Sequence, residues 1–193
     1  MTEKEKAAAG LLYNANYDKE LIADRIASQK KCKAYNAIDN EDTEKRREAI
    51  KNIVAQIGEG GYIEQPFYCD YGYNIKIGKN FYSNYNLVIL DCALVTIGDN
   101  VFIGPDCGIY TAGHPINAQQ RNEGLEYAYG ITIGSNVWIG GGVRIMPGVT
   151  IGDNCVIGAG SVVTKDIPSG VIAVGNPCRV LREIDERDII TQQ

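Results

Sequence analysis

Residues 133–163 read IGSNVWIGGGVRIMPGVTIGDNCVIGAGSVV, and an aliphatic residue begins every unit of six. A helix places apolar residues about 3.6 positions apart, and a half-buried strand simply alternates, so neither explains this period. Short strands joined by turns, stacked as the faces of a coil, do explain it. We therefore predict a mainly β fold, a parallel β-helix of hexapeptide repeats, with its core formed by the leading residues Ile133, Ile139, Ile145, Ile151, Ile157 and Val163.

Asparagine recurs three places after the leading residue of several units. It occupies this place at Asn80, Asn100, Asn136 and Asn154. Asparagine and glycine are the residues that best tolerate a positive φ, which favours tight turns at these places. If successive coils then pair like the strands of a sheet, about 4.8 Å apart, most backbone amides are satisfied between coils.

The segments around the repeats suggest three regions. Residues 1–58 form a helical segment, with helices expected from Asp18 to about Tyr35 and from about Glu41 to Ile57, ending before Gly58. Such helices commonly cap one end of a solenoid, and they can also wall a substrate pocket. Residues 59–185 form the β-helix and residues 186–193 a tail; the chain just before this tail should fold back over the last coil.

The repeats are weak at first and are then interrupted twice. They begin near Ile75 and Ile77, and the 20 residues from Ile77 to Ile97 predict a slip in register between residues 82 and 91. They stop again at Thr111, so that residues 111–130 form an extended, polar loop. Loops of more than about 12 residues are commonly functional or disordered, and this one contains the only histidine of the chain.

Composition excludes several classes of function. The net charge is -5 without a basic stripe, so nucleic acid is not an expected partner. No segment approaches the ~20 apolar residues of a membrane span. Six scattered cysteines and one histidine predict no metal site, and together with the absence of an export signal they favour a reducing cytoplasm.

His114 is the candidate catalytic residue of the loop. Histidine has an ordinary pKa near neutrality, which suits a general base that takes a proton from a hydroxyl group. The alternative is an exposed imidazole without a role. Glu126, in the same loop, is a candidate for orienting the histidine ring, or else a solvated carboxylate. Ser161 lacks the Gly-x-Ser-x-Gly setting of a nucleophile and fits the core better.

Several motifs in order resemble the maltose and galactoside O-acetyltransferase family. They are Asn84-Tyr-Asn, Thr111-Ala-Gly-His114-Pro, residues 133–140, residues 158–168 and Gly175-Asn-Pro-Cys-Arg179, and the likeness runs from about Ala7 to Ile184. The resemblance implies a left-handed β-helix. It also implies acetyl transfer from acetyl-coenzyme A to a sugar hydroxyl, by a homotrimer with its sites between subunits.

The resemblance also assigns roles to residues on the catalytic and coenzyme side. His114 falls on the family's general base, the N–H of Gly141 on the donor that holds the developing oxyanion, and Asn84 on a residue that contacts acceptor and acetyl group. Trp138 would form an apolar wall for the pantetheine arm. The matching positions for coenzyme A are Gly141, Ala159, Thr164, Lys165, Arg179 and Arg182.

On the acceptor side the chain departs from the galactoside enzymes. Ala15 and Cys92 replace acidic residues, and Asp70 stands where those enzymes have a small hydroxyl residue. The Cys69-Asp-Tyr-Gly run resembles the maltose branch, so maltose or glucose is the expected acceptor, with Asp70, Asn84 and Cys92 as acceptor contacts. Another hydroxyl acceptor, such as a galactoside or an antibiotic, and a non-catalytic trimeric scaffold remain as alternatives.

Overall fold

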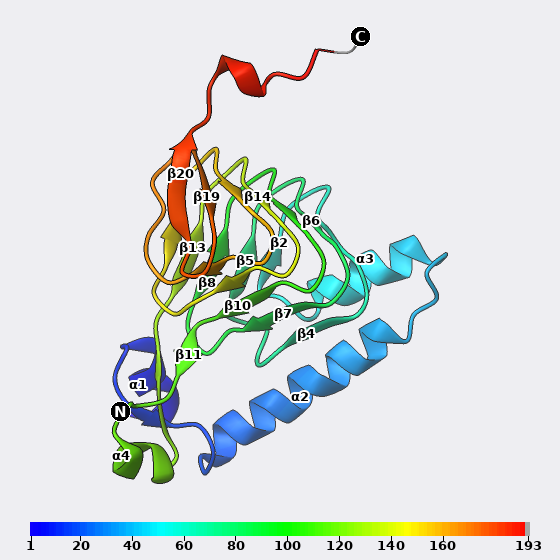
Figure 1. Ribbon diagram of the computed structural model, residues 1–193. Coiled ribbons are helices and arrows are strands. Elements are labelled where there is room, and N and C mark those ends of the chain that lie inside the picture. Colours follow the sequence, from blue (N-terminus) through cyan, green and yellow to red (C-terminus); the bar gives the residue numbers. More distant parts are fainter. Residues whose placement is uncertain (192–193) are drawn as a thin grey trace.

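The computed structural model describes residues 1–191 as a parallel β-solenoid with a few helices at its side (Figure 1). The chain winds through three sheets in turn, so that each coil has three faces. The first sheet contains β2 (Gln56–Ile57), β5 (Ile75–Ile77), β8 (Val95–Ile97), β13 (Ile131–Ile133) and β16 (Thr150–Ile151).

The other two faces are built in the same way. The second sheet contains β3 (Tyr62–Ile63), β6 (Tyr82–Ser83), β9 (Phe102–Ile103), β14 (Trp138–Ile139), β17 (Val156–Ile157), β19 (Val171–Val174) and β20 (Arg179–Glu183). The third contains β4 (Phe67–Cys69), β7 (Leu87–Leu90), β10 (Gly108–Tyr110), β15 (Arg144–Ile145) and β18 (Val162–Val163). Neighbouring strands run parallel, except that β20 returns antiparallel to β19.

Three edges join the faces, and they are named here for later use. The asparagine edge, between the first and second sheets, contains residues 58–61, 78–81, 98–101, 134–137 and 152–155. The glycine edge, between the second and third sheets, contains residues 84–86, 104–107, 140–143 and 158–161. The loop edge, between the third and first sheets, contains residues 70–74, 91–94, 111–130, 146–149 and 164–166.

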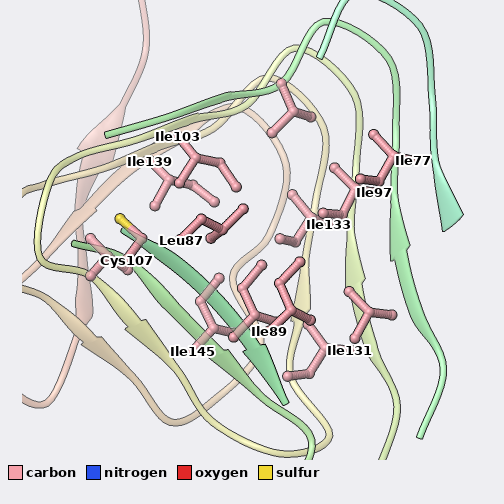
Figure 2. Close-up of a cluster of buried hydrophobic side chains, with 14 of the residues drawn as sticks. Ile77, Leu87, Ile89, Ile97, Ile103, Cys107, Ile131, Ile133, Ile139 and Ile145 are labelled. Carbon is pink, nitrogen blue, oxygen red and sulfur yellow. The ribbon is translucent and has the colours of Figure 1, made fainter. Parts of the chain in front are cut away.

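The core consists of like residues stacked from coil to coil, as the repeat predicts. Ile77 pairs with Ile97, which pairs in turn with Ile133, and Figure 2 shows these side chains in one row inside the coil. Each is at most 2% exposed. Burial of a side chain of this size stabilises the fold by roughly 1.5–3 kcal/mol, so the stack is the main source of stability.

The asparagine edge confirms the predicted turns. Asn80, Asn100, Asn136 and Asn154 have φ between 52° and 57°. Their side-chain amides form a ladder, in which each Nδ2 donates to the Oδ1 of the next coil at 3.0–3.1 Å. One residue type therefore supplies both the turn conformation and a bond between coils.

The solenoid starts earlier than the sequence indicated, and the predicted slip between residues 82 and 91 is wrong. Ile57 already pairs with Ile77, so the first coils contain 20 residues each. Tyr82 pairs regularly with Phe102, which leaves no slip there. The two extra residues instead lie at the loop edge, where the buried carboxylate of Asp91 accepts a hydrogen bond from the N–H of Tyr71 at 2.8 Å and thereby holds the wider turn.

Three helices precede the solenoid: α1 (Glu3–Ala8), α2 (Lys19–Asn36) and α3 (Thr43–Lys51). Helix α2 matches its prediction and begins directly after the N-cap residue Asp18, whose carboxylate accepts from the N–H of Leu21 at 2.9 Å. Helix α3 ends at Lys51 and not at Ile57, because the residues after it enter the core and then form the first strand. Helix α2 packs against β4 and covers the first coils (Figure 1).

The loop at residues 111–130 has its own secondary structure. It contains β11 (Ala112–Gly113), α4 (Ala118–Asn122) and β12 (Leu125–Ala128). Strand β12 pairs antiparallel with β11 and with β1 (Tyr13–Asn14), and the resulting sheet projects from the solenoid beside α1 and α4 (Figure 1). The loop is therefore a built element, fixed by the N-terminal segment.

The end of the chain folds back onto the last coil through β20 and continues into a short 3₁₀ helix, η1 (Glu186–Asp188). Of the predicted tail, Gln192 and Gln193 lie outside the described residues. None of the helices within residues 1–191 is long and apolar enough to cross a membrane.

Candidate active site

The residues singled out by the sequence fall into two groups on different edges. The first group lies at the loop edge and contains His114, Glu126, Asp70, Cys92, Thr164 and Lys165. The second group lies at the glycine edge or on the second sheet, and contains Asn84, Trp138, Gly141, Ala159, Arg179 and Arg182.

One face of the solenoid separates the two groups. Asn84 directly follows β6, in the turn that leads into β7, whereas His114 follows β10 and β11. Strands β7 and β10 pair in parallel, with Leu90 opposite Tyr110. The two residues therefore lie at opposite ends of one face. At 3.3 Å per residue, the three steps of β7 from Leu87 to Leu90 alone span roughly 10 Å. A single chain does not bring His114 and Asn84 into one site.

His114 is held by the return strand of its own loop. Its Nδ1 lies 3.2 Å from the carbonyl oxygen of Leu125, at the start of β12. A carbonyl oxygen can only accept, so Nδ1 carries the proton and donates, and Nε2 is left as a proton acceptor. The side chain is 50% exposed, so Nε2 can reach a bound molecule. The sequence offers no signal for this partner, because the atom belongs to the backbone.

Glu126, the residue that the sequence named as a candidate for orienting the imidazole, lies near Nε2 and not near Nδ1. Its Oε1 lies 4.0 Å from His114 Nε2, on the other side of the ring from the Leu125 carbonyl. Its Oε2 accepts from the hydroxyl of Tyr13 at 3.0 Å, and its Oε1 accepts from the side-chain amide of Asn16 at 3.4 Å. The pairing of β1 with β12 sets Tyr13 directly opposite Glu126.

Asp70 and Cys92 lie together near this carboxylate. The Cys92 thiol donates to Asp70 Oδ2 at 3.4 Å. Burial raises the pKa of Cys92, and the negative charges of Asp70 and Glu126 raise it further, so the thiol stays neutral. Burial also raises the pKa of Asp70, against the opposing effects of the Cys92 hydrogen bond and the Arg25 charge. The loop edge thus combines two carboxyl groups with a small neutral donor.

Two residues of the second group, Asn84 and Trp138, line an apolar groove of about 480 Å³. The groove is lined by Tyr82, Asn84, Phe102, Ile103, Gly104 and Trp138. Trp138 and Phe102 stand opposite each other on neighbouring strands, and their side chains are 58% and 52% exposed. Exposed aromatic side chains in a row are suited to a long, partly apolar ligand.

Backbone donors lie along the glycine edge beside this groove. The hydrogen bonds within residues 1–191 use neither the N–H of Gly141 nor that of Ala159, although the neighbouring amides of Gly140 and Gly160 bond between coils. Both N–H groups are therefore free to donate to a ligand. This is the property required of an oxyanion donor and of amides that bind a coenzyme arm.

The basic residues differ in how they are engaged. Arg182 makes a two-point contact with Asp188, with 2.7 Å from Nη1 to Oδ2 and 2.5 Å from Nη2 to Oδ1. Arg179 donates to the carbonyl oxygen of Cys178 at 2.7 Å. Lys165 is exposed at the loop edge, next to Thr164. A phosphate group would compete with Asp188 for Arg182 but not for Lys165.

The cysteines and acids do not form a metal centre in the described part of the chain. Within residues 1–191, no three side chains of His, Cys, Asp or Glu come together as a set of ligands. All six cysteines are buried and free, as expected for small apolar residues of the core.

A solenoid of hexapeptide coils with a helical cap and an interrupting histidine loop is characteristic of hexapeptide-repeat transferases. Family models match accordingly: the maltose acetyltransferase hexapeptide capping motif over residues 6–58, the bacterial transferase hexapeptide (six repeats) over residues 130–165, and the hexapeptide repeat of succinyl-transferase over residues 94–116.

Individual relatives narrow this class. The galactoside O-acetyltransferase of Escherichia coli is 48% identical over 97% of this chain and 92% of its own. The crystal structure of a maltose O-acetyltransferase from Clostridium difficile has a TM-score of 0.94 and 52% identity, covering 96% of this chain and 99% of that one. A galactoside acetyltransferase in complex with coenzyme A has a TM-score of 0.94 and 48% identity, covering 97% and 94%. This chain belongs to the maltose and galactoside O-acetyltransferase family and is an acetyltransferase.

Proposed function

We propose that this acetyltransferase transfers the acetyl group of acetyl-coenzyme A to a hydroxyl of a sugar such as maltose or glucose, with His114 as the general base. One observation carries the proposal: the Leu125 carbonyl fixes the proton on Nδ1, so that the exposed Nε2 is ready to accept one. Nε2 would take the proton of the acceptor hydroxyl as its oxygen attacks the thioester carbon. The C–S bond then breaks, and the coenzyme A thiolate takes the proton back from Nε2.

The second group of residues would hold the donor. The N–H of Gly141 would donate to the oxygen that becomes negative during attack, and Asn84 would contact the acetyl group and the acceptor. The groove beside Trp138 fits the pantetheine arm, with the N–H of Ala159 as a further donor. Arg179 and Arg182, together with Thr164 and Lys165 of the first group, would bind the remaining polar groups of coenzyme A. The complex of a relative with coenzyme A supports the choice of this coenzyme.

The separation of the two groups supports a site formed by two copies of the chain. His114 and Asn84 lie at opposite ends of one face, with the length of β7 and β10 between them. In a homotrimer, the loop edge of one subunit could meet the glycine edge of the next, so that each of the three sites takes His114 from one subunit and Asn84 from its neighbour.

Complementation between two inactive variants tests the shared site. His114→Ala and Asn84→Ala are expected to be inactive separately. After unfolding and joint refolding in equal amounts, about a quarter of the sites would combine an intact His114 with an intact Asn84, and that share of the activity should return. Activity that stays absent in verified hybrids would contradict a site between subunits.

The acceptor is tested with a pair of sugars. Maltose and isopropyl β-galactoside are each incubated with acetyl-coenzyme A, and release of the free thiol is measured. We expect faster release with maltose, because Asp70 and Cys92 replace the pattern of the galactoside enzymes. Preference for the galactoside would overturn the assignment of the acceptor but not that of the reaction.

The scaffold hypothesis is tested by the binding of acetyl-coenzyme A. A ligand that binds only the native state raises the free energy of unfolding, by about 2.7 kcal/mol at 100 times its Kd, and therefore also raises the unfolding temperature. A scaffold would show no thermal shift with acetyl-coenzyme A and no thiol release with any sugar.

A further inference from the structure

We infer that Glu126 binds a second hydroxyl group of the acceptor, so that the enzyme selects polyols whose second hydroxyl lies one or two carbons from the acetylated one. The inference rests on the proposed function, since it assigns the acceptor class of the same site. In this inference Glu126 binds the acceptor and does not orient the ring of His114.

The geometry separates Glu126 from the orientation of His114. The imidazole is already held at Nδ1 by the Leu125 carbonyl. The 4.0 Å between Glu126 Oε1 and His114 Nε2 exceeds the length of a hydrogen bond. The carboxylate therefore stands beside the reacting nitrogen without bonding to it.

The same distance fits two neighbouring hydroxyls. A hydroxyl that loses its proton to Nε2 must lie about 2.8 Å from that nitrogen, and a second one that donates to Oε1 must lie about as close to the carboxylate. Two acceptor atoms 4.0 Å apart can receive the protons of hydroxyls on adjacent carbons, or on carbons separated by one more. A simple alcohol would use only Nε2.

The surroundings of Glu126 hold it in place for this role. Tyr13 is 1% exposed and donates to Oε2, and Asn16 contacts Oε1, so the carboxylate is oriented from the N-terminal segment. The side chain is 12% exposed. A carboxylate has about four sites for accepting hydrogen bonds, and the two contacts leave capacity for an acceptor hydroxyl.

A largely buried carboxylate that lacks a hydrogen-bond donor is unfavourable, and this free-energy cost sets how strongly the enzyme should discriminate between acceptors. An acceptor without the second hydroxyl would leave the remaining accepting site of Glu126 Oε1 without its donor. We expect kcat/KM to fall by about 10–100-fold for such an analogue, mainly through a higher KM. The negative charge of nearby Asp70 strengthens the preference for a hydroxyl donor over a carbonyl or carboxylate acceptor at this point.

The test uses methyl α-D-glucopyranoside and its 2-, 3-, 4- and 6-deoxy analogues with the full-length enzyme. Glu126→Gln is the variant. Its amide oxygen keeps the hydrogen bond from Tyr13, while its amide NH2 group replaces Oε1, the accepting atom next to Nε2 of His114. Glu123→Gln is the matched control, an exposed carboxylate in the same loop. For each enzyme, kcat and KM are measured by thiol release.

The analogue that lacks the acetylated hydroxyl cannot react. Among the other three, we expect one to have a kcat/KM about 10–100-fold lower than that of the parent sugar, both with the wild type and with Glu123→Gln. In Glu126→Gln, this penalty should shrink to within a few-fold, with a higher KM for the parent sugar. Equal losses of kcat on every sugar would instead mean that Glu126 acts through the charge of His114, and would overturn the inference. If the wild type acetylates none of the five sugars, the proposed sugar acceptor fails, and the inference fails with it.

Discussion

The asparagine edge and the loop edge belong to the same coils, yet they are built by opposite rules. At the asparagine edge, every coil repeats the same turn, with Asn80, Asn100, Asn136 and Asn154 in one ladder. At the loop edge, one coil is closed by the buried carboxylate of Asp91, and the next is interrupted by the loop that contains His114. The regular edge needs only local turn chemistry, whereas the irregular edge depends on contacts between distant segments.

The difference shows where this fold can accommodate chemistry. A stack of like residues buries almost every side chain that faces inward, so it has no room for a reactive group. The loop edge instead collects groups from β1, β12 and the corners after β4 and β7 around one histidine. Changes at the loop edge should therefore remove activity or create specific strain, while changes at the asparagine edge should only weaken the stack.

The largest expected effect is the loss of activity in His114→Ala. Removal of the general base should lower kcat by about 10²–10⁴-fold, because His114 is the only histidine of the chain and no second imidazole can replace it. The unfolding temperature and the oligomeric state should stay within error of the wild type, since the half-exposed ring makes one hydrogen bond. Turnover close to normal in a folded variant would refute the mechanism.

The next effect concerns the wider turn at the loop edge, where Gly72 has φ of 80°. A methyl group there would overlap the carbonyl oxygen of Ile53, which belongs to the backbone and cannot move aside. Gly72→Ala should therefore lower the free energy of unfolding by about 2–4 kcal/mol.

Gly160→Ala is its matched control at the glycine edge. Gly160 has a similar φ of 71°, but a methyl group there meets nothing within 4 Å. It should cost about 1 kcal/mol, from the positive φ alone. Urea unfolding of both variants measures the difference, and equal losses would show that the wider turn at residues 70–74 is not tightly packed.

The sequence predicts most of the fold because its strongest signals are local. The six-residue period and the recurring asparagines determine the coil and its turns without reference to distant residues. The same local view misplaced the extra residues of the first coils. Asp91 closes the wider turn through the N–H of Tyr71, which lies 20 residues away, and neither residue resembles a repeat position.

The candidate site was predictable only in part, for the same reason. His114 was found as the one histidine of an unusually long loop. Its partner is the carbonyl of Leu125, and Glu126 is positioned by Tyr13, which lies 113 residues earlier. A contact made by a backbone oxygen does not depend on the residue type, so the sequence gives no sign of it. The pairing of β1 with β12 lies outside the repeats, so the six-residue period does not predict it.

The pH dependence of the free energy of unfolding tests the role of Asp91 in the wider turn. Burial raises the pKa of this carboxyl group to about 7, with a contribution from the charge of Asp70 and against hydrogen bonds from the backbone of Tyr71, Asn74 and Gly72. An unfolded aspartate has a pKa of about 3.9. The folded state therefore holds the proton more tightly, so the contribution of Asp91 to stability is complete below pH 4 and is lost as the pH rises to about 7.

Asp91→Asn removes this titration while it keeps one accepting oxygen for Tyr71. Relative to the wild type, the variant should gain about 3.5 kcal/mol between pH 4 and pH 7.5, whatever its stability at pH 4. Urea unfolding at a series of pH values measures the gain. A constant difference between the two proteins over this range would mean that Asp91 does not titrate there.

The smallest expected effect is at the asparagine edge, where two contributions of one residue can be separated. Asn100 has φ of 55°, accepts from Asn80 at 3.0 Å and donates to Asn136 at 3.1 Å, all in an exposed turn. Asn100→Ala loses the tolerance of positive φ and the ladder, whereas Asn100→Gly loses only the ladder. We expect alanine to cost about 1–2 kcal/mol and glycine less than about 1 kcal/mol, because exposed hydrogen bonds contribute little net stability. Equal costs for the two variants would mean that the asparagine ladder, and not the tolerance of positive φ, is what asparagine contributes at this edge. The asparagine edge would then depend on contacts between coils, as the loop edge does.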